Sequence, residues 1–417
     1  MKPLFILIIS LLITLVSCEK YPDRGTFDNP LLVYHGDAFV DLGLSLDETQ
    51  DGYAIAGMRT VISRSESNLG GSIIDSATQD LAVLKTDAGG DLEWAYINAA
   101  SGYDEARSIR SLADGSVICA GVASSAEGSV SGNDMIITKM GAGGSVSWQK
   151  TYGGRGNQAA NDIIECDDAG FLVLGTSDTE NIAGTFGQDN PRGRLNIYIL
   201  KLNAMGDSLW SVSYGFDEDD IGVKISRDLG GNGYMVLATT DNHGPGQGMK
   251  NILFLRINNV GNVTRSEIFG STANEKAVDL IVQDNAYMIL GACGPDGNND
   301  NEMYILKLTE DIYDTPLLEK RISISGRRLV LNSLCYHPDG FFIIAGAVGD
   351  ALEEDMLFYF MDTDGREYAE PHIPAGQGSQ VINDMIVDTQ ENIVSVGTNG
   401  TETSSLITFY KVKKPTL

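Results

Sequence analysis

Basic residues are scarce in this sequence. Of its 417 residues, 29 are Lys or Arg and 57 are Asp or Glu, so the formal net charge at pH 7 is -28. No local cluster of Lys and Arg offsets this charge, which would repel the phosphates of nucleic acid and the headgroups of anionic lipid. Nucleic acid is therefore excluded as an expected partner. Solubility of an exported protein explains the acidity better than a site for a cation or a basic partner does.

Cysteine and histidine are also rare, with five and four copies. The sequence has no CxxC pair and no Cys/His group at zinc-ligand spacing. The four histidines are widely separated: His35, His243, His337 and His372. Four cysteines lie beyond the N-terminal region: Cys119, Cys166, Cys293 and Cys335. They fall on different strands of the repeat described below, where paired ends would often lie on opposite faces, so we expect buried free thiols.

Proline is limited to 11 residues, whereas glycine reaches 48. Val, Ile, Leu, Tyr and Phe recur in short runs between the glycines, a composition typical of many strands joined by tight turns. We therefore expect an all-β protein.

The N-terminus has the pattern of a lipoprotein signal peptide. Lys2 provides a positive start, an apolar run follows, and Leu-Val-Ser-Cys ends at Cys18 as a lipobox, whose thiol would carry the lipid. The run is too short for a comfortable membrane span, and nothing later resembles one. We predict a signal peptide over 1–17, a lipidated tether over 18–30 and a membrane partner reached through this anchor. Glu19 favours the outer membrane, with either a periplasmic or a surface-exposed position.

One phrase recurs along the rest of the chain: an apolar strand, Asp-Gly or a substitute, a second apolar run ending in Gly, a loop, and a polar residue opening a third apolar run. The residue that closes the second strand marks seven copies: Gly57, Gly121, Gly175, Ala238, Gly291, Gly346 and Gly397. Each copy holds four strand candidates. Runs such as FLVLG and IYILK are continuously apolar, which indicates burial on both faces. We predict a seven-bladed β-propeller with four-stranded antiparallel blades over 31–417.

The fourth strands and the chain ends support this architecture. Trp94, Trp148 and Trp210 each stand four residues after a turn glycine, and we expect them to pack between blades. The seventh copy lacks a fourth strand, whereas residues 31–36 match the fourth-strand pattern. The N-terminal strand is therefore expected to complete the last blade and close the ring.

The segment YGGRGNQAANDIIECDDAGFLVLGTSD, residues 152–178, resembles the bacterial SBBP-type propeller repeat. Weaker copies cover roughly residues 31–411, with departures at Ala238 and around residues 311–318. The resemblance implies an exported or envelope propeller, generally without assigned catalysis.

Binding residues are expected on the face that collects the long loops, residues 59–79, 122–133, 176–194 and 239–250, because loops on a rigid scaffold commonly carry function. Candidates from the interblade loops of that face are Asp104, Arg155, Asn157, Asp217, Asp219, Arg327 and Gln377. Scattered surface charge is the competing interpretation.

A polar column also runs through the first strands: Ser45, Ser108, Asp162, Lys224, Asp279, Ser333 and Asp384. We expect it to line the channel. A second polar position opens each third strand, from Asp80 to Ser405, and is expected to cap turns.

Asp296, Asn298 and Asp300 place oxygen atoms at alternate positions, as calcium loops do, but the EF-hand glycine and distal glutamate are missing. An ordinary polar loop is the favoured interpretation, and we expect no cofactor.

The function expected from these features is a monomeric, non-catalytic envelope lipoprotein that binds a protein or glycan partner. The alternatives are a glycan hydrolase or lyase using Asp162, Asp279 or Asp384, and a calcium-dependent adhesin.

Overall fold

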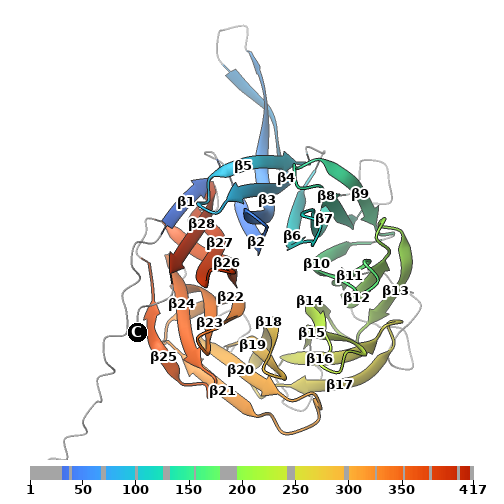
Figure 1. Ribbon diagram of the computed structural model, residues 1–417, viewed down its shortest axis with the longest axis vertical. Coiled ribbons are helices and arrows are strands. Elements are labelled where there is room, and N and C mark those ends of the chain that lie inside the picture. Colours follow the sequence, from blue (N-terminus) through green and yellow to red (C-terminus); the bar gives the residue numbers. More distant parts are fainter. Residues whose placement is uncertain are drawn as a thin grey trace, which may run out of the picture.

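The chain forms a ring of β-sheets around a central channel (Figure 1). The computed structural model describes residues 31–36, 40–66, 72–98, 102–124, 132–154, 156–178, 195–241, 249–294, 300–324, 326–350, 353–374, 378–401 and 404–413. The signal peptide and tether predicted over 1–30 lie outside these residues. The described residues include no helix with the length and apolarity needed to cross a membrane.

Seven four-stranded antiparallel sheets form the blades, as predicted. Blade 1 contains β2 (Leu42–Glu48), β3 (Gly52–Glu66), β4 (Ser72–Asp87) and β5 (Leu92–Ile97). Blade 2 contains β6 (Asp104–Ser111), β7 (Val117–Ser124), β8 (Asn133–Met140) and β9 (Val146–Tyr152). Blade 3 contains β10 (Gln158–Glu165), β11 (Phe171–Ser177), β12 (Asn196–Leu202) and β13 (Ser208–Tyr214). Blade 4 contains β14 (Asp220–Arg227), β15 (Gly233–Asp241), β16 (Lys250–Asn258) and β17 (Val263–Phe269).

The remaining blades follow the same order. Blade 5 contains β18 (Asn274–Gln283), β19 (Ala286–Gly294), β20 (Glu302–Leu308) and β21 (Leu318–Ser323). Blade 6 contains β22 (Arg328–His337), β23 (Phe341–Gly349), β24 (Glu354–Asp362) and β25 (Glu367–His372). Blade 7 contains β26 (Ser379–Val387), β27 (Asn392–Thr401), β28 (Ser404–Lys413) and β1 (Leu31–His35).

The ring closes through the N-terminal strand. β1 pairs antiparallel with β28, from Leu31 opposite Lys411 to His35 opposite Ile407. This confirms the predicted closure. Because β1 supplies the fourth strand of blade 7, that blade has the same four strands as the others and the edge of β28 is covered.

The strand order gives the ring two faces. Turns between first and second strands, and between third and fourth strands, lie on one face, which we call the turn face. Loops between second and third strands, and those that lead to the next blade, lie on the opposite face, which we call the loop face. Both β1 and β28 reach the turn face at their Leu31 and Lys413 ends.

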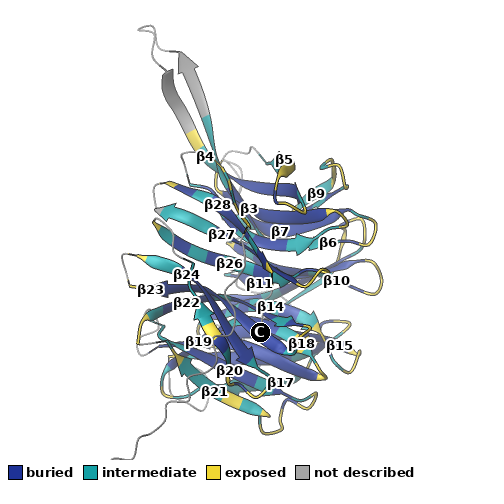
Figure 2. Ribbon diagram, turned by 60° about the vertical axis from the view of Figure 1, so that its left-hand side comes forward, coloured by how far each residue is buried: buried dark blue, intermediate teal, exposed yellow. Residues whose placement is uncertain are grey.

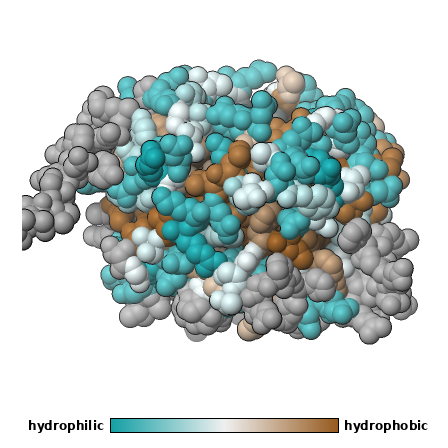
Figure 3. All heavy atoms as spheres, turned by 90° about the horizontal axis from the view of Figure 1, so that it is seen from below, coloured by the Kyte–Doolittle hydropathy of each residue, from teal (hydrophilic) through white to brown (hydrophobic). Residues whose placement is uncertain are grey.

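The core lies between blades. Each of the seven apolar clusters joins two neighbouring blades; one of them packs Leu46 and Ile55 of blade 1 against Val396 and Phe409 of blade 7. Every residue of β11 is buried, and Figure 2 shows that much of the length of the other second and third strands is buried as well. The continuously apolar runs in the sequence are therefore explained by burial of both sheet faces. The outer wall instead shows mainly hydrophilic side chains with apolar patches between them (Figure 3).

The tryptophans pack between blades, as predicted. A Cβ added to Gly144 would lie 2.8 Å from the Trp94 ring, and one added to Gly206 would lie 2.9 Å from the Trp148 ring. Trp94 also donates a hydrogen bond of 3.0 Å to the carbonyl of Ala142. Each ring therefore covers the turn glycine of the next blade.

The four cysteines in the described residues are free and buried, as predicted.

The sequence predicted a long loop over residues 59–79. For the residues of this range that the structure describes, the prediction is wrong. β3 and β4 continue past the blade as paired strands, from Arg59 opposite Asp80 to Glu66 opposite Ser72. They form a two-stranded ribbon that projects beyond the ring (Figures 1 and 2), which we call the arm.

Candidate functional site

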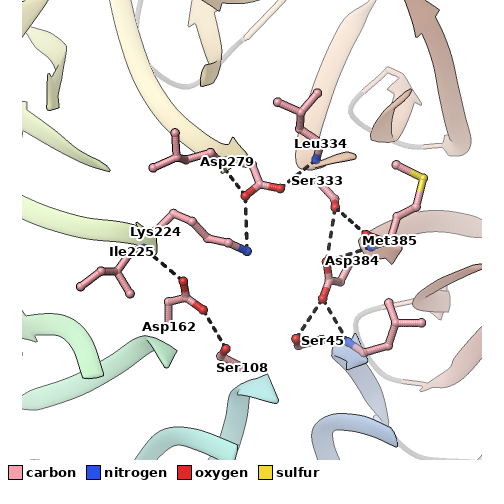
Figure 4. Close-up of polar contacts among 12 residues, drawn as sticks. Ser45, Ser108, Asp162, Lys224, Ile225, Asp279, Ser333, Leu334, Asp384 and Met385 are labelled. Carbon is pink, nitrogen blue, oxygen red and sulfur yellow. Dashed lines mark hydrogen bonds and ion pairs between the residues drawn. The ribbon is translucent and has the colours of Figure 1, made fainter. Parts of the chain in front are cut away.

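The polar column of the first strands forms a ring of side chains around the channel (Figure 4). Ser45 donates a hydrogen bond of 2.9 Å to Asp384, and Ser108 donates one of 2.9 Å to Asp162. Asp162 and Asp384 belong to blades 3 and 7, so each of these contacts joins two neighbouring blades.

Backbone groups complete the ring. Asp162 accepts a hydrogen bond of 3.1 Å from the N–H of Ile225 in blade 4, and Asp279 accepts one of 2.8 Å from the N–H of Leu334 in blade 6. The ammonium of Lys224 lies 3.3 Å from Asp279.

The last junctions are made by the two serines of blades 1 and 6. Ser333 donates to Asp384 over 3.3 Å, and the Ile109 N–H donates to Ser45 over 3.4 Å. All seven junctions between blades are therefore bridged at this level.

A β-bulge positions each member of the ring. In every first strand the pairing with the second strand shifts by one residue immediately before the ring residue, for example between Ala160 and Asp162. A bulge re-aims the following side chain. The extra residue is itself used where it is asparagine: Asn161 donates a 2.7 Å hydrogen bond to the carbonyl of Gly222, and Asn383 donates one of 2.7 Å to the carbonyl of Gly43.

Two cations, Lys224 of the ring and Arg110 beside it, lie among the three carboxylates of the ring. Burial opposes the charge on Lys224, but the carboxylates of Asp279 and Asp162 outweigh it and raise the pKa of the ammonium. Burial likewise opposes the charge on Arg110, and Asp162 and Asp47 raise its pKa. Arg110 lies 2.7 Å from Asp162. Both cations therefore stay charged because neighbouring carboxylates, fixed in position by the fold, stabilise them.

A cavity of about 370 Å³ lies on the turn-face side of the ring. Ring residues form its inner end, and Asp47 and Arg110 form part of its wall together with Ile281 and Ile386. Asp47 accepts a 2.7 Å hydrogen bond from the N–H of Ser111, and burial raises the pKa of its carboxyl.

Asp384, which lines this cavity, is fully engaged by neighbouring groups. Asp384 accepts from Ser45 and from the Leu46 N–H on one oxygen, and from Ser333 and the Met385 N–H on the other. All four hydrogen bonds come from the scaffold, so both oxygens of Asp384 are used to hold neighbouring strands.

Cys335 also lines the cavity, but burial raises its thiol pKa well above the usual range, so it is not an activated nucleophile. In the part of the chain that the structure describes, no group of three or more His, Cys, Asp or Glu side chains is arranged to hold a metal ion.

The loop face offers a second cavity, of about 310 Å³, at the base of the arm. Thr60 of β3 and Gln79 of β4 line it on the arm side, and Val40 and Tyr103 line it from the adjoining segments. Tyr103 is 38% exposed and its backbone bridges Gln79 in parallel orientation. The arm and this cavity were missed in the sequence.

The structure places several predicted binding residues in scaffold contacts. Asp104 is buried and accepts a 2.9 Å hydrogen bond from the N–H of Ser124, so its carboxylate fixes the end of β7 and is not presented to solvent. Asp219 accepts a 3.1 Å bond from the N–H of Leu195. Asn157 is exposed, and its amide donates a 2.6 Å bond to Asp178.

Asp217 and Arg327 are exposed at interblade loops, and Arg327 lies 3.9 Å from Asp355. Arg155 and Gln377 lie outside the described residues. The same holds for Asp296 and Asn298 of the calcium hypothesis. Their third member, Asp300, lies 3.0 Å from the ammonium of Lys276.

Comparisons with known proteins bear on the fold. No protein-family model matches the chain, and no curated protein matches it in sequence. The WD40 domain of Neurospora crassa Pan2 is similar in structure, with 9% identity, a TM-score of 0.50, and coverage of 92% of this chain and 98% of that one. A puromycin hydrolase structure matches with 10% identity, a TM-score of 0.49, and coverage of 86% of this chain and 50% of that one. At such low identity the likeness to the Pan2 domain supports the β-propeller fold alone.

Proposed function

We propose that the protein is a non-catalytic lipoprotein of the cell envelope that binds a partner protein through its loop face. The observation that supports this most is the arm. A two-stranded ribbon is marginally stable in water by itself, and the ring already has its full set of blade strands without the extension. In its described part beyond Thr60 and Gln79, the ribbon pairs with no third strand, and such a ribbon is suited to contact another molecule.

The outer edge of β3 has the geometry for such a contact. The pairing of β3 with β2 ends at Met58, and β3 continues to Glu66. The N–H of Thr60 points away from β4, since it donates a 2.9 Å bond to Asp41. Backbone groups alternate in direction along a strand, so those of Ile62 point to the same outer side. An extended segment of a partner would find hydrogen-bonding groups there.

The lipid anchor is the second part of the proposal. It is supported by the lipobox that ends at Cys18 and by the resemblance to SBBP-type repeats of envelope proteins. Glu19 favours the outer membrane. A glycan is the alternative ligand for the loop face, since the cavity beside Tyr103 and Gln79 combines an aromatic ring with an amide.

Site-specific photo-crosslinking in envelopes tests the partner. A photoreactive residue at Thr78, beside the cavity, should give a defined crosslinked product, whereas one at Gln390 on the turn face should not. Replacing residues 61–78 by a short turn should abolish the product formed from a photoreactive residue at Tyr103, while the melting temperature of the ring is kept. Crosslinks at Tyr103 that survive loss of the arm would contradict the proposal. Glycan-array binding that also survives would favour the glycan alternative.

The enzyme alternative has one supporting observation. Burial raises the pKa of Asp279, although the nearby Lys224 ammonium acts in the opposite direction. A glycan hydrolase or lyase would use such a carboxyl as its proton donor. Screening the purified protein on envelope polysaccharides tests it, with D279N as the control that must lose any turnover found.

A further inference from the structure

The turns between third and fourth strands carry exposed apolar side chains in successive blades. Leu92 and Val146 lie at the start of the fourth strands of blades 1 and 2. Met205 lies in the turn of blade 3 and Leu209 is the second residue of the strand that follows, while Val260 lies in the turn of blade 4. Met205 is 67% exposed and Val260 62%.

Two more blades continue the series on the turn face. Tyr313 and Leu317 precede β21 in blade 5, and Leu31 and Leu32 begin β1 in blade 7. We call these nine residues the apolar rim. Blade 6 is the exception, because its turn, residues 363–366, contains no large apolar side chain and holds the exposed ion pair Asp364–Arg366. Six of the seven blades thus place apolar side chains at one level of the ring.

A single exposed apolar side chain needs no explanation on a protein surface. The apolar rim is different, because its exposed side chains recur on the same face in six blades. A flat apolar surface could therefore contact several of them at once. The turn of blade 2 that precedes Val146 and the turn of blade 4 that carries Val260 contain no charged residue. The one carboxylate in the turn of blade 3, Asp207, lies 2.7 Å from the ammonium of Lys150.

The position of the chain's N-terminal strand indicates what contacts this border. Leu31 is itself a rim residue, and only twelve residues separate it from Cys18. A chain of that length spans at most about 45 Å when fully extended. A lipid on Cys18 would therefore hold the ring within that distance of a bilayer, with the apolar rim at the end of the tether.

We infer that the apolar rim rests in the interfacial region of the bilayer, with zwitterionic lipid as its partner. This inference rests on the lipid anchor of the proposed function. The net charge of -28 disfavours anionic headgroups. With the turn face on the membrane, the loop face and the arm point away from it, toward the partner.

The tryptophans provide a native probe. The chain contains three, and all lie beside the rim: Trp94 is two residues after Leu92, Trp148 two after Val146, and Trp210 adjoins Leu209. Their fluorescence therefore reports on the rim in blades 1 to 3. Tryptophan is also a residue that favours the membrane–water interface.

The experiment couples the Cys18 thiol of the unlipidated chain, without its signal peptide, to a maleimide phospholipid in phosphatidylcholine vesicles. The other four thiols are buried and their pKa values are raised, so Cys18 is the thiol that reacts. Brominated phosphatidylcholine should lower the tryptophan fluorescence relative to unbrominated vesicles. The rim variant L209S/V260S should lose most of this quenching, and the loop-face variant M249S should keep it. Added phosphatidylglycerol should weaken it.

Absence of quenching in the coupled protein would overturn the inference, as would quenching that the rim variant retains. Concentration-dependent self-association of the uncoupled chain that L209S/V260S abolishes would assign the rim to a second copy instead. Mass spectrometry of the native Cys18 separates the two proposals. A missing lipid there contradicts the anchor, whereas the vesicle result depends only on the rim.

Discussion

The carboxylate of Asp384 in blade 7 accepts a hydrogen bond from the backbone N–H of Leu46 in blade 1, 3.0 Å away. The same relationship joins Asp162 to Ile225 and Asp279 to Leu334. Three carboxylates therefore hold the first strand of the following blade, and the intervening junctions use serine hydroxyls and Lys224. The ring in the channel therefore connects the first strands of all seven blades.

Asp384→Asn should destabilise the fold. Four donors point at the two carboxylate oxygens, and an amide presents one acceptor where two are needed, leaving buried donors without a partner. We expect a loss of about 1–3 kcal/mol in the free energy of unfolding, measured by urea denaturation. Asp364→Asn, in an exposed turn, should stay within about 0.5 kcal/mol of the parent. An unchanged midpoint for Asp384→Asn would mean that the ring does not fasten the blades.

Lys224→Met should lower the free energy of unfolding, because it leaves a buried carboxylate of the ring without its cation. Asp279 would lose its cationic neighbour while staying buried, so its pKa should rise further. Since the Lys224 side chain is 28% exposed, we expect a loss of about 1–3 kcal/mol at neutral pH, less than for a fully buried pair. In acid, where Asp279 becomes neutral, the loss should shrink. The double variant Lys224→Met/Asp279→Asn should recover part of the stability at pH 7, and failure to recover any would contradict the pairing.

The propeller was predictable because its signal is local and repeated. The run that became β11 begins with four consecutive large apolar residues, and this pattern predicts burial of both faces. The closure by Leu31–His35 was predictable for the same reason, since the last repeat lacked one strand. Neither the propeller fold nor its closure depends on knowing which side chains contact one another around the channel.

The ring was only partly predictable. The column from Ser45 to Asp384 was visible in the sequence, but the bulges depend on the register between strands. Arg110 and Asp47 occur in single blades, so no repeat marked them. Asp104 illustrates the opposite error: a charge in an interblade loop indicated a surface site, yet the backbone N–H of Ser124 binds it in the interior.

The arm was missed because residues 59–79 are rich in Ser and Gly. Thr60, Val61 and Ile62 on one side of this segment, and Ile73 and Ile74 on the other, are β-branched and would have indicated a hairpin. β3 and β4 are longer than the corresponding strands of the other blades, so the repeat pattern predicted a loop for the additional residues.

Two adjacent glycines allow a sharp test of the packing between blades. Gly144 has a φ of +80°, and a Cβ there would meet the Trp94 ring. Gly144→Ala should therefore cost about 1–3 kcal/mol and shift the Trp94 emission. Gly143→Ala, one residue earlier, has no heavy atom within 4 Å of its added Cβ and should be neutral. Equal melting temperatures for both variants would contradict the role given to Trp94.

Asp220 should give the stability a specific dependence on pH. It is fully buried at the start of β14, and burial raises its pKa to about 6, against an ordinary value of 3.8. Between these values the folded state binds more protons than the unfolded state, so this residue's contribution to stability falls as pH rises from about 4 to about 6 and is constant above.

Asp220→Asn removes the proton exchange and keeps a side chain of similar size. The variant should match the parent near pH 4 and exceed it by about 1–3 kcal/mol at pH 7.5, measured by urea denaturation across this range. Asp217→Asn, at an exposed position three residues earlier, should show no such divergence. A difference between Asp220→Asn and the parent that stays constant from pH 4 to pH 7.5 would show that burial of this carboxyl is not coupled to its ionisation.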